Sequence, residues 1–148
     1  MMNYLALLAL LAGGSIAIQA SMNAQLGVLL KSSLIGTTVA FTCSVFFTLL
    51  AVIVSTRHYP QAEAISSVPF YLWFSGGALS AFAVAMFYYL IPKMGVGPMM
   101  SYALTGQLLI AIMASHFGWF DFPVKQITAV KFTGIVALVN GLILINWE

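Results

Sequence analysis

The chain has 148 residues, of which 62% are hydrophobic and only 5% are charged, and its formal net charge is +2. Soluble domains carry about 25% charged residues, so this chain has too few charges to cover a surface that faces water. The composition therefore excludes a soluble globular domain and a nucleic-acid-binding surface, and it predicts an all-α protein embedded in lipid.

Five long apolar segments follow one another along the chain, each close to the ~20 residues that cross a bilayer. We expect membrane-spanning helices over residues 4–30, 34–55, 69–91, 99–117 and 127–147. Helices are expected rather than strands, because the apolar runs do not alternate with polar residues and each segment must satisfy its own backbone in lipid. Together they are expected to form a single membrane domain over the whole chain.

Proline, glycine and charged residues are expected to separate these segments. Residues 57–60 end the second segment, and the polar residues 61–67 are expected to form a loop. Pro92 is expected to end the third segment, because proline stops a regular helix, and a tight turn over residues 95–98 follows. Residues 118–126 are expected to form the last loop.

Lysine and arginine are almost evenly divided between the two sides of the membrane that five spans define. Arg57, Lys125 and Lys131 would lie on one side, and Lys31 and Lys93 on the other. Orientation follows differences in such counts, so a single orientation and a dual topology with an antiparallel dimer both remain open. No basic residue precedes Lys31, and a cleaved signal peptide is therefore not expected.

Acidic residues lie outside all five predicted spans, since Glu63, Asp121 and Glu148 fall in loops or at the chain end. Ion and proton pathways usually depend on ionisable residues inside the membrane, so an exporter built around a buried carboxylate is not expected. The chain also lacks a phosphate loop, a nucleophile motif and metal-ligand spacing, and its one cysteine is Cys43. Neither an enzyme nor a bound cofactor or metal is therefore expected.

Neutral polar residues instead form one face of the first predicted span. Ser15, Gln19 and Asn23 recur at every fourth position, which places them on the same side of a helix. Such a face should contact protein or water rather than lipid, so either interhelical hydrogen bonds or a substrate-lined cavity explains it. The same span contains Gly13-Gly14 near its middle, and the sequence leaves open whether the helix breaks there.

In the fourth predicted span a second such face is formed by Ala103, Gln107, Ala111 and Ser115. It consists mostly of small residues with one amide, so either close helix packing with one polar contact or a substrate-lined cavity explains it. Amides offer both donors and acceptors, so Gln19, Asn23 and Gln107 suit a neutral or zwitterionic solute. His116 follows Ser115 and is a candidate proton carrier because histidine titrates near neutral pH, the alternative being an interfacial histidine with no such role.

Small residues recur at every fourth position in the last predicted span, at Thr133, Ala137 and Gly141. This pattern lets membrane helices approach closely, and we predict that it forms a dimer contact. The third span repeats the pattern with Gly77, Ala81 and Ala85.

The order and spacing of these residues resemble those of the small YdcZ-like family of the drug/metabolite transporter (DMT) superfamily. The resemblance covers nearly the whole chain and is based on Gly14, Gln19, Asn23 and Leu26, on Gly106-Gln107-Leu108, on His116-Phe117-Gly118, and on Gly134 and Gly141. Many members carry aspartate directly before the His-Phe-Gly triplet, where this chain has Ser115. Because of this departure at Ser115, the resemblance does not imply proton coupling through an aspartate of that helix. The related small multidrug exporters use a buried glutamate in helix 1, which this chain also lacks.

The resemblance implies a five-helix unit equivalent to half of a ten-helix inverted-repeat transporter, present as an antiparallel homodimer, a pair of homologous chains or a fused double. It also implies a substrate site near the bilayer midplane and alternating access. We therefore predict a small transporter of the bacterial inner membrane that moves a small polar or zwitterionic solute as a dual-topology homodimer. The alternatives are a passive channel and a non-transporting scaffold subunit.

Overall fold

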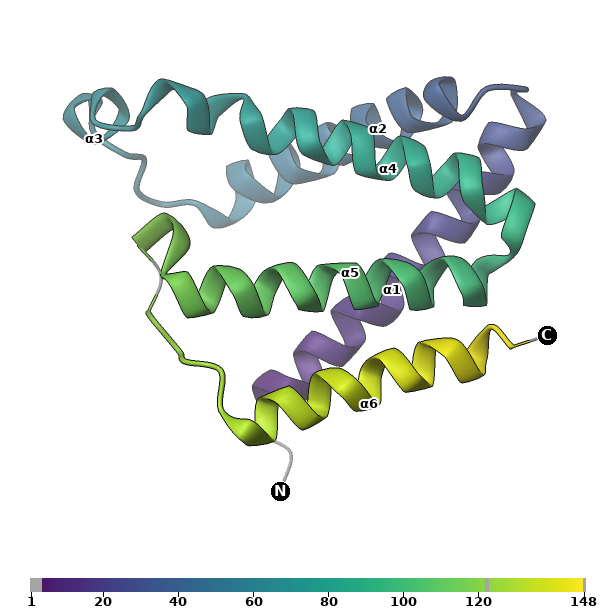
Figure 1. The fold of residues 1–148 in the computed structure, drawn as a ribbon. Helices are drawn as coiled ribbons and strands as arrows, with labels where there is room; N and C mark the ends of the chain where they lie inside the picture. The colour runs from purple at the N-terminus through teal and green to yellow at the C-terminus, as the bar shows by residue number, and fades with distance from the viewer. Residues whose placement is uncertain (1–3, 122, 148) are drawn as a thin grey trace. The chain divides into compact units, whose positions relative to one another are not determined.

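The computed structural model describes residues 4–121 and 123–147, and within them it confirms the expected all-α class (Figure 1). Glu148 lies outside the described residues. The chain divides into two compact units, residues 1–93 and 94–148. The first unit contains α1 (Tyr4–Leu29), α2 (Ser33–Ser55), α3 (Ala62–Ser66), the 3-10 helix η1 (Phe70–Trp73) and nearly all of α4 (Ser75–Met94). The second contains α5 (Val96–Phe117), the 3-10 helix η2 (Trp119–Asp121) and α6 (Ala129–Ile145).

Four helical segments are long and apolar enough to cross a membrane, namely α1, α2, the segment Phe70–Met94 and α5. Helix α6 has 17 residues, so the predicted span over 127–147 is shorter at both ends than the sequence suggested. At 1.5 Å per residue α6 is about 25 Å long, slightly less than the roughly 30 Å of a hydrocarbon core. A fifth crossing by α6 stays a prediction.

Helix α1 continues without a break through Gly13-Gly14. Its 26 residues extend about 39 Å, which exceeds the thickness of the hydrocarbon core, so we expect the helix to tilt in the bilayer. A side chain added at either glycine would meet nothing within 4 Å. The two glycines therefore leave α1 helical and make no close contact within the described chain.

A close contact between two glycines joins α1 to α2. Lys31, with φ 54°, reverses the chain in the left-handed conformation, and the Ser32 N–H donates to the Gly27 carbonyl oxygen at 2.9 Å. The Ser32 hydroxyl then caps α2 by accepting from the Ile35 N–H at 3.3 Å. A Cβ at Gly36 would lie 3.0 Å from the Gly27 Cα, so the two helices touch through their backbones.

We expect Gly36→Ala to lower the thermal unfolding midpoint of the detergent-solubilised protein, because the new methyl group would press on Gly27 backbone atoms. Overpacking of this kind costs about 1–3 kcal/mol, which exceeds the roughly 0.5–1 kcal/mol that alanine gains over glycine in a helix. Gly13→Ala is the matched control, since open space surrounds that position, and its midpoint should stay equal or rise. A Gly36→Ala protein as stable as the unchanged chain would contradict the tight α1–α2 contact.

Two segments expected to be loops contain short helices. Residues 61–67 include the single turn of α3, and residues 118–126 include η2. The third predicted span also begins differently, because η1 precedes α4 instead of one continuous helix. Helical turns of three to five residues carry too little periodicity to be seen in a sequence.

Pro92 does not end the third span, which is a correction to the sequence prediction. Proline removes a hydrogen bond to the residue four positions earlier and leaves the residues after it unaffected, so α4 continues to Met94. The expected turn over residues 95–98 is reduced to Gly95, which has φ 87°. Pro98 lies in the first turn of α5, where backbone N–H groups have no partner within the helix.

Candidate functional site

Two of the three polar residues on the expected face of α1 bind a tyrosine of α4. The Asn23 Nδ2 donates to Gln19 Oε1 at 2.9 Å and to the Tyr88 hydroxyl oxygen at 2.9 Å. The Tyr88 hydroxyl in turn donates to Gln19 Oε1 at 3.3 Å. We call Gln19, Asn23 and Tyr88 the polar triad. Because Tyr88 is only 2% exposed, the triad ties α1 to α4 inside the first unit.

Each amide of the triad keeps one polar group outside these bonds. The Gln19 Nε2 carries two N–H donors and the Asn23 Oδ1 is an acceptor, and neither has a hydrogen-bond partner among the described residues. All three triad residues border a groove of about 460 Å³. The residues that border this groove therefore retain a donor pair and an acceptor that the triad does not use.

The groove lies between α1, α2 and α4, and its remaining walls are mainly apolar. They are formed by Leu26, Val39, Ala40, Phe41, Cys43, Ser44, Phe47 and Val84. Ser44 donates its hydroxyl to the Ala40 carbonyl oxygen at 2.9 Å, so the polar contacts available to a ligand are concentrated at the triad. The volume falls within the range of small-molecule sites, which are mostly apolar with a few placed polar groups.

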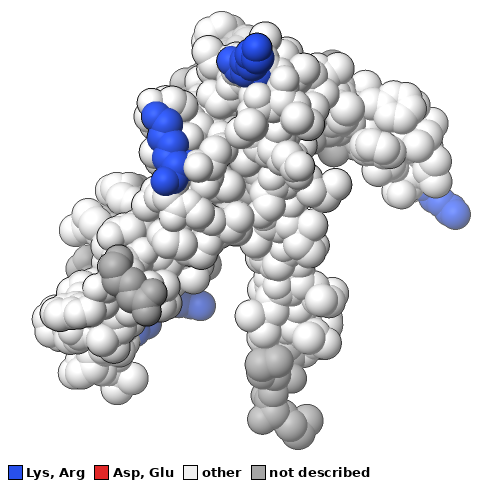
Figure 2. Space-filling model, turned by 90° about the vertical axis from the view of Figure 1, so that its right-hand side faces the viewer, with Lys and Arg blue, Asp and Glu red and all other residues white. Residues whose placement is uncertain are grey.

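Charge is scarce around this site, as expected from the composition. None of the described residues that line the groove is an acid or a base that is charged at neutral pH. On the face shown in Figure 2, uncharged side chains predominate and the few charged ones are lysine or arginine. An isolated ion in such a groove would lose its hydration without gaining a counter-charge, so a neutral or zwitterionic molecule fits better.

The other predicted substrate-binding residues lie elsewhere. Ser15 is exposed and donates its hydroxyl to the Leu11 carbonyl oxygen at 2.9 Å, outside the groove. Gln107 is exposed on α5, in the second unit. Its grouping with the triad around one cavity stays a prediction.

Ser115 and His116 anchor the segment that follows α5. The Lys125 N–H donates to the Ser115 carbonyl oxygen at 2.9 Å, and the Ile127 N–H donates to His116 Nδ1 at 3.4 Å. The second bond requires His116 Nδ1 to be unprotonated, so this histidine acts as an acceptor that fixes the start of α6. Its role as a proton carrier stays a prediction.

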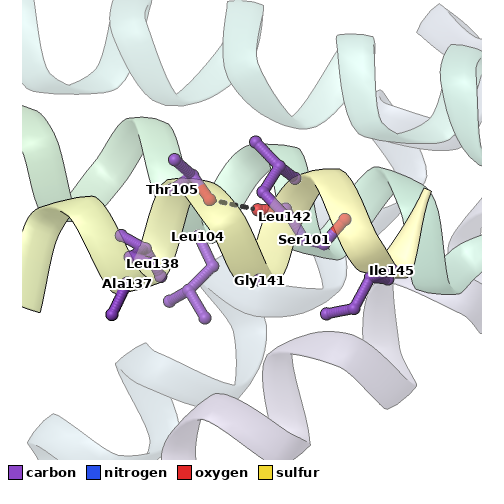
Figure 3. Close-up of a pocket in the computed structure, with 8 residues that line it drawn as sticks. All are labelled: Ser101, Leu104, Thr105, Ala137, Leu138, Gly141, Leu142 and Ile145. Atoms are coloured by element: carbon purple, nitrogen blue, oxygen red, sulfur yellow. Dashed lines mark hydrogen bonds between the residues drawn. The ribbon is translucent and has the colours of Figure 1, made fainter. Parts of the chain in front are cut away.

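Two of the three predicted dimer-contact residues border a groove between α5 and α6. Ala137 and Gly141 line this groove of about 300 Å³ from α6, opposite Ser101 and Thr105 of α5 (Figure 3). Thr105 donates its hydroxyl to the Ser101 carbonyl oxygen at 2.8 Å, the bond drawn dashed in Figure 3. Thr133 is exposed. A dimer contact through this face stays a prediction.

Tyr88 is the site residue that the sequence reasoning missed. It lies three positions after Ala85 and seven after Ala81, so it continues the small-residue face recognised in the third predicted span. Both Ala85 and Tyr88 are buried. A tyrosine on a helix face otherwise made of small residues must find a partner for its hydroxyl in lipid, and this signal was available in the sequence.

The fold and the triad define a multi-pass membrane protein with an uncharged polar groove of the size that small molecules occupy. The chain belongs to the family described as "Putative inner membrane exporter, YdcZ", whose model matches residues 4–144. This confirms the resemblance to the YdcZ-like family. The family description and the apolar helices support a multi-pass transporter of the inner membrane, and membrane exporters are not a class of enzyme. No curated protein and no solved structure gives a match.

Proposed function

We propose that this protein exports a small neutral or zwitterionic polar solute that binds in the groove between α1, α2 and α4. The observation that carries the proposal is the polar triad, which offers the Gln19 Nε2 donors and the Asn23 Oδ1 acceptor beside an uncharged groove. Polar groups inside a membrane are retained where they bind another part of the protein or a substrate. In the triad, Asn23 and Gln19 bind Tyr88 of α4, and their remaining polar groups are left for a substrate.

We further propose that the protein works as a dual-topology homodimer with alternating access. The nearly equal lysine and arginine counts on the two sides support this arrangement, since neither orientation is favoured. In an antiparallel pair the two end states are related by symmetry. The solute or the membrane potential then determines which state is populated.

The triad suggests how solute binding would be coupled to movement. Helices α1 and α2 touch through Gly27 and Gly36, so we propose that they move as one rigid pair. Within the triad, α4 is held to α1 by hydrogen bonds of Tyr88. A solute held by the free Gln19 Nε2 and Asn23 Oδ1 groups would also be placed to accept from Asn23 Nδ2 or donate to Gln19 Oε1, and it would then compete with Tyr88 for those two atoms. Because of this competition, the solute would make different contacts in the two end states of alternating access. A solute can shift the populations of two states only if it binds them differently.

Alkylation of Cys43 with N-ethylmaleimide should reduce export about tenfold, because the added group would fill a groove that the thiol lines. The measurement is efflux from proteoliposomes of a solute first found by screening neutral and zwitterionic compounds with the unchanged protein. Cys43→Ser is the matched control and should export at the normal rate with and without the reagent, since Cys43 is the chain's one cysteine. Normal efflux from protein shown by mass spectrometry to be fully alkylated would exclude this groove as the solute site.

The same proteoliposomes distinguish a transporter from the two alternatives. A carrier saturates at low solute concentration, whereas flux through a passive channel rises in proportion to the gradient. A scaffold subunit would instead co-purify with another protein and show no flux alone. The mainly apolar lining that α2 and α4 give to the groove supports the carrier, because a channel needs a continuous wet path.

A further inference from the structure

Two adjoining hollows lie in the second unit, between the C-terminal part of α5 and the segment that connects it to α6. They have volumes of about 450 and 260 Å³ and share Ala111, Ser115 and Lys125 as lining residues. Lys131 lines the smaller hollow. None of these residues belongs to the polar triad, so the hollows are separate from the groove that we assign to the solute.

Lysine side chains give these hollows a positive edge. The Lys131 ammonium donates to the Gln126 carbonyl oxygen at 2.8 Å and to that of Lys125 at 3.5 Å, which fixes its position and leaves a third N–H available. The Lys125 backbone is fixed in turn by its bond to Ser115. Asp121 is the one acidic residue of the connecting segment between α5 and α6, against Lys125 in the same segment and Lys131 in the first turn of α6.

The start of α6 adds to the positive potential. Thr128 caps the helix by accepting from the Lys131 N–H at 3.3 Å, and the first N–H groups of a helix carry a partial positive charge. Lysine side chains beside a helix N-terminus favour a bound anion, and phosphate groups are well suited to such a position. A soluble phosphate and a lipid headgroup share this chemistry.

The surroundings of the lysines favour a lipid as the source of the phosphate. Trp119 stacks on Phe117 with ring centroids 6.5 Å apart, and tryptophan is enriched at the depth of the lipid headgroups. Besides the lysines, the hollows are lined by apolar residues of α5 such as Ala114 and Ile112. A lining that combines lysines with apolar residues matches a molecule with an anionic head and an acyl chain.

We propose that these hollows form a binding site for an anionic phospholipid. Lys125 and Lys131 pair with the headgroup phosphate, the Ser115 hydroxyl donates to it, and an acyl chain lies along α5. Since Lys131 also holds the carbonyl groups that precede α6, a bound lipid stabilises the connection between α5 and α6. The site is independent of the proposed transport function.

The test measures how much phosphatidylglycerol and phosphatidylcholine the purified full-length protein retains, using native mass spectrometry. Lys125→Gln with Lys131→Gln should retain phosphatidylglycerol about thirtyfold less well, since each lysine near the headgroups contributes about 1 kcal/mol. Lys31→Gln with Lys93→Gln is the matched control, because it removes the same charge from the first unit and should leave retention unchanged. Lys125→Gln alone keeps the Lys131 bonds to the backbone and should reduce retention about fivefold, so it decides the result if the double variant unfolds.

Three results would overturn the proposal. Equal losses in the two double variants would mean that only the total charge matters. Equal retention of phosphatidylcholine and phosphatidylglycerol by the unchanged protein would show that the site does not select an anionic head. Displacement of the lipid by inorganic phosphate, but not by chloride at the same ionic strength, would assign the site to a soluble phosphate instead.

Discussion

Tyr88→Phe should lower export about tenfold while the protein remains folded and inserted in the membrane. The substitution removes one hydroxyl, which accepts from Asn23 at 2.9 Å and donates to Gln19 at 3.3 Å. The hydroxyl is the group that we propose the solute displaces, so its loss removes the contact that distinguishes the two states; about 1.4 kcal/mol of lost difference corresponds to a tenfold change. The amides would keep their mutual bond but lose the partner that links them to α4. Efflux from proteoliposomes measures the effect.

Tyr89→Phe is the matched control, because it removes the same atom from the next residue along α4. Tyr89 is exposed, and its ring lies 3.6 Å from the Lys93 ammonium, a contact that phenylalanine retains. Export by this variant should therefore be unchanged. Equal losses in the Tyr88 and Tyr89 variants would show that the triad has no special part in transport.

The stability of the Tyr88 variant separates a site residue from a merely structural one. Hydrogen bonds between membrane helices contribute about 0.6 kcal/mol on average, so the unfolding midpoint should fall only slightly. A large drop in export with a small drop in the midpoint indicates a direct role in solute binding. Unchanged export after Gln19, Asn23 and Gln107 are all replaced by leucine would overturn the proposed solute site altogether.

The helices were predictable because long apolar runs leave the chain few alternatives in lipid. The pairing of Gln19 with Asn23 was likewise visible as a spacing of four on one helix face. Their bonds to Tyr88 depend on how α4 packs against α1, and no local pattern specifies a contact between residues 65 or more positions apart. The sequence therefore indicated the two amides of the triad but not Tyr88, which holds them to α4.

Helix boundaries were less predictable than the helices themselves, for two local reasons. Hydropathy does not distinguish the last turn of a helix from the apolar residues beyond it, so the last span was predicted too long. Pro92 was expected to end the helix, but proline removes a hydrogen bond only to the preceding turn, so the helix continues beyond it. The contact of Gly36 with Gly27 was missed because it follows from the turn at Lys31, whose positive φ is unusual for lysine.

A cysteine placed after Glu148 in a Cys43→Ser background should be labelled in about half of the chains by a membrane-impermeant maleimide applied to intact cells. The remaining half should react only after lysis. This follows from the three-to-two division of lysine and arginine between the two sides, which gives the insertion machinery little reason to prefer one orientation. The labelled fraction is measured by the mass shift of the purified protein.

Ala64→Cys in the same background is the control that also tests whether α6 crosses the membrane. Residue 64 is exposed in the connection between α2 and α4, on the side opposite the C-terminus if there are five crossings. Half labelling at both sites means dual topology and supports the antiparallel homodimer. Complete labelling at one site and none at the other means five crossings in a single orientation, so an oppositely oriented partner chain would be needed for the symmetric mechanism. All-or-none labelling that agrees at the two sites would mean that α6, with its 17 residues, does not cross the bilayer, which would exclude the five-helix repeat as well.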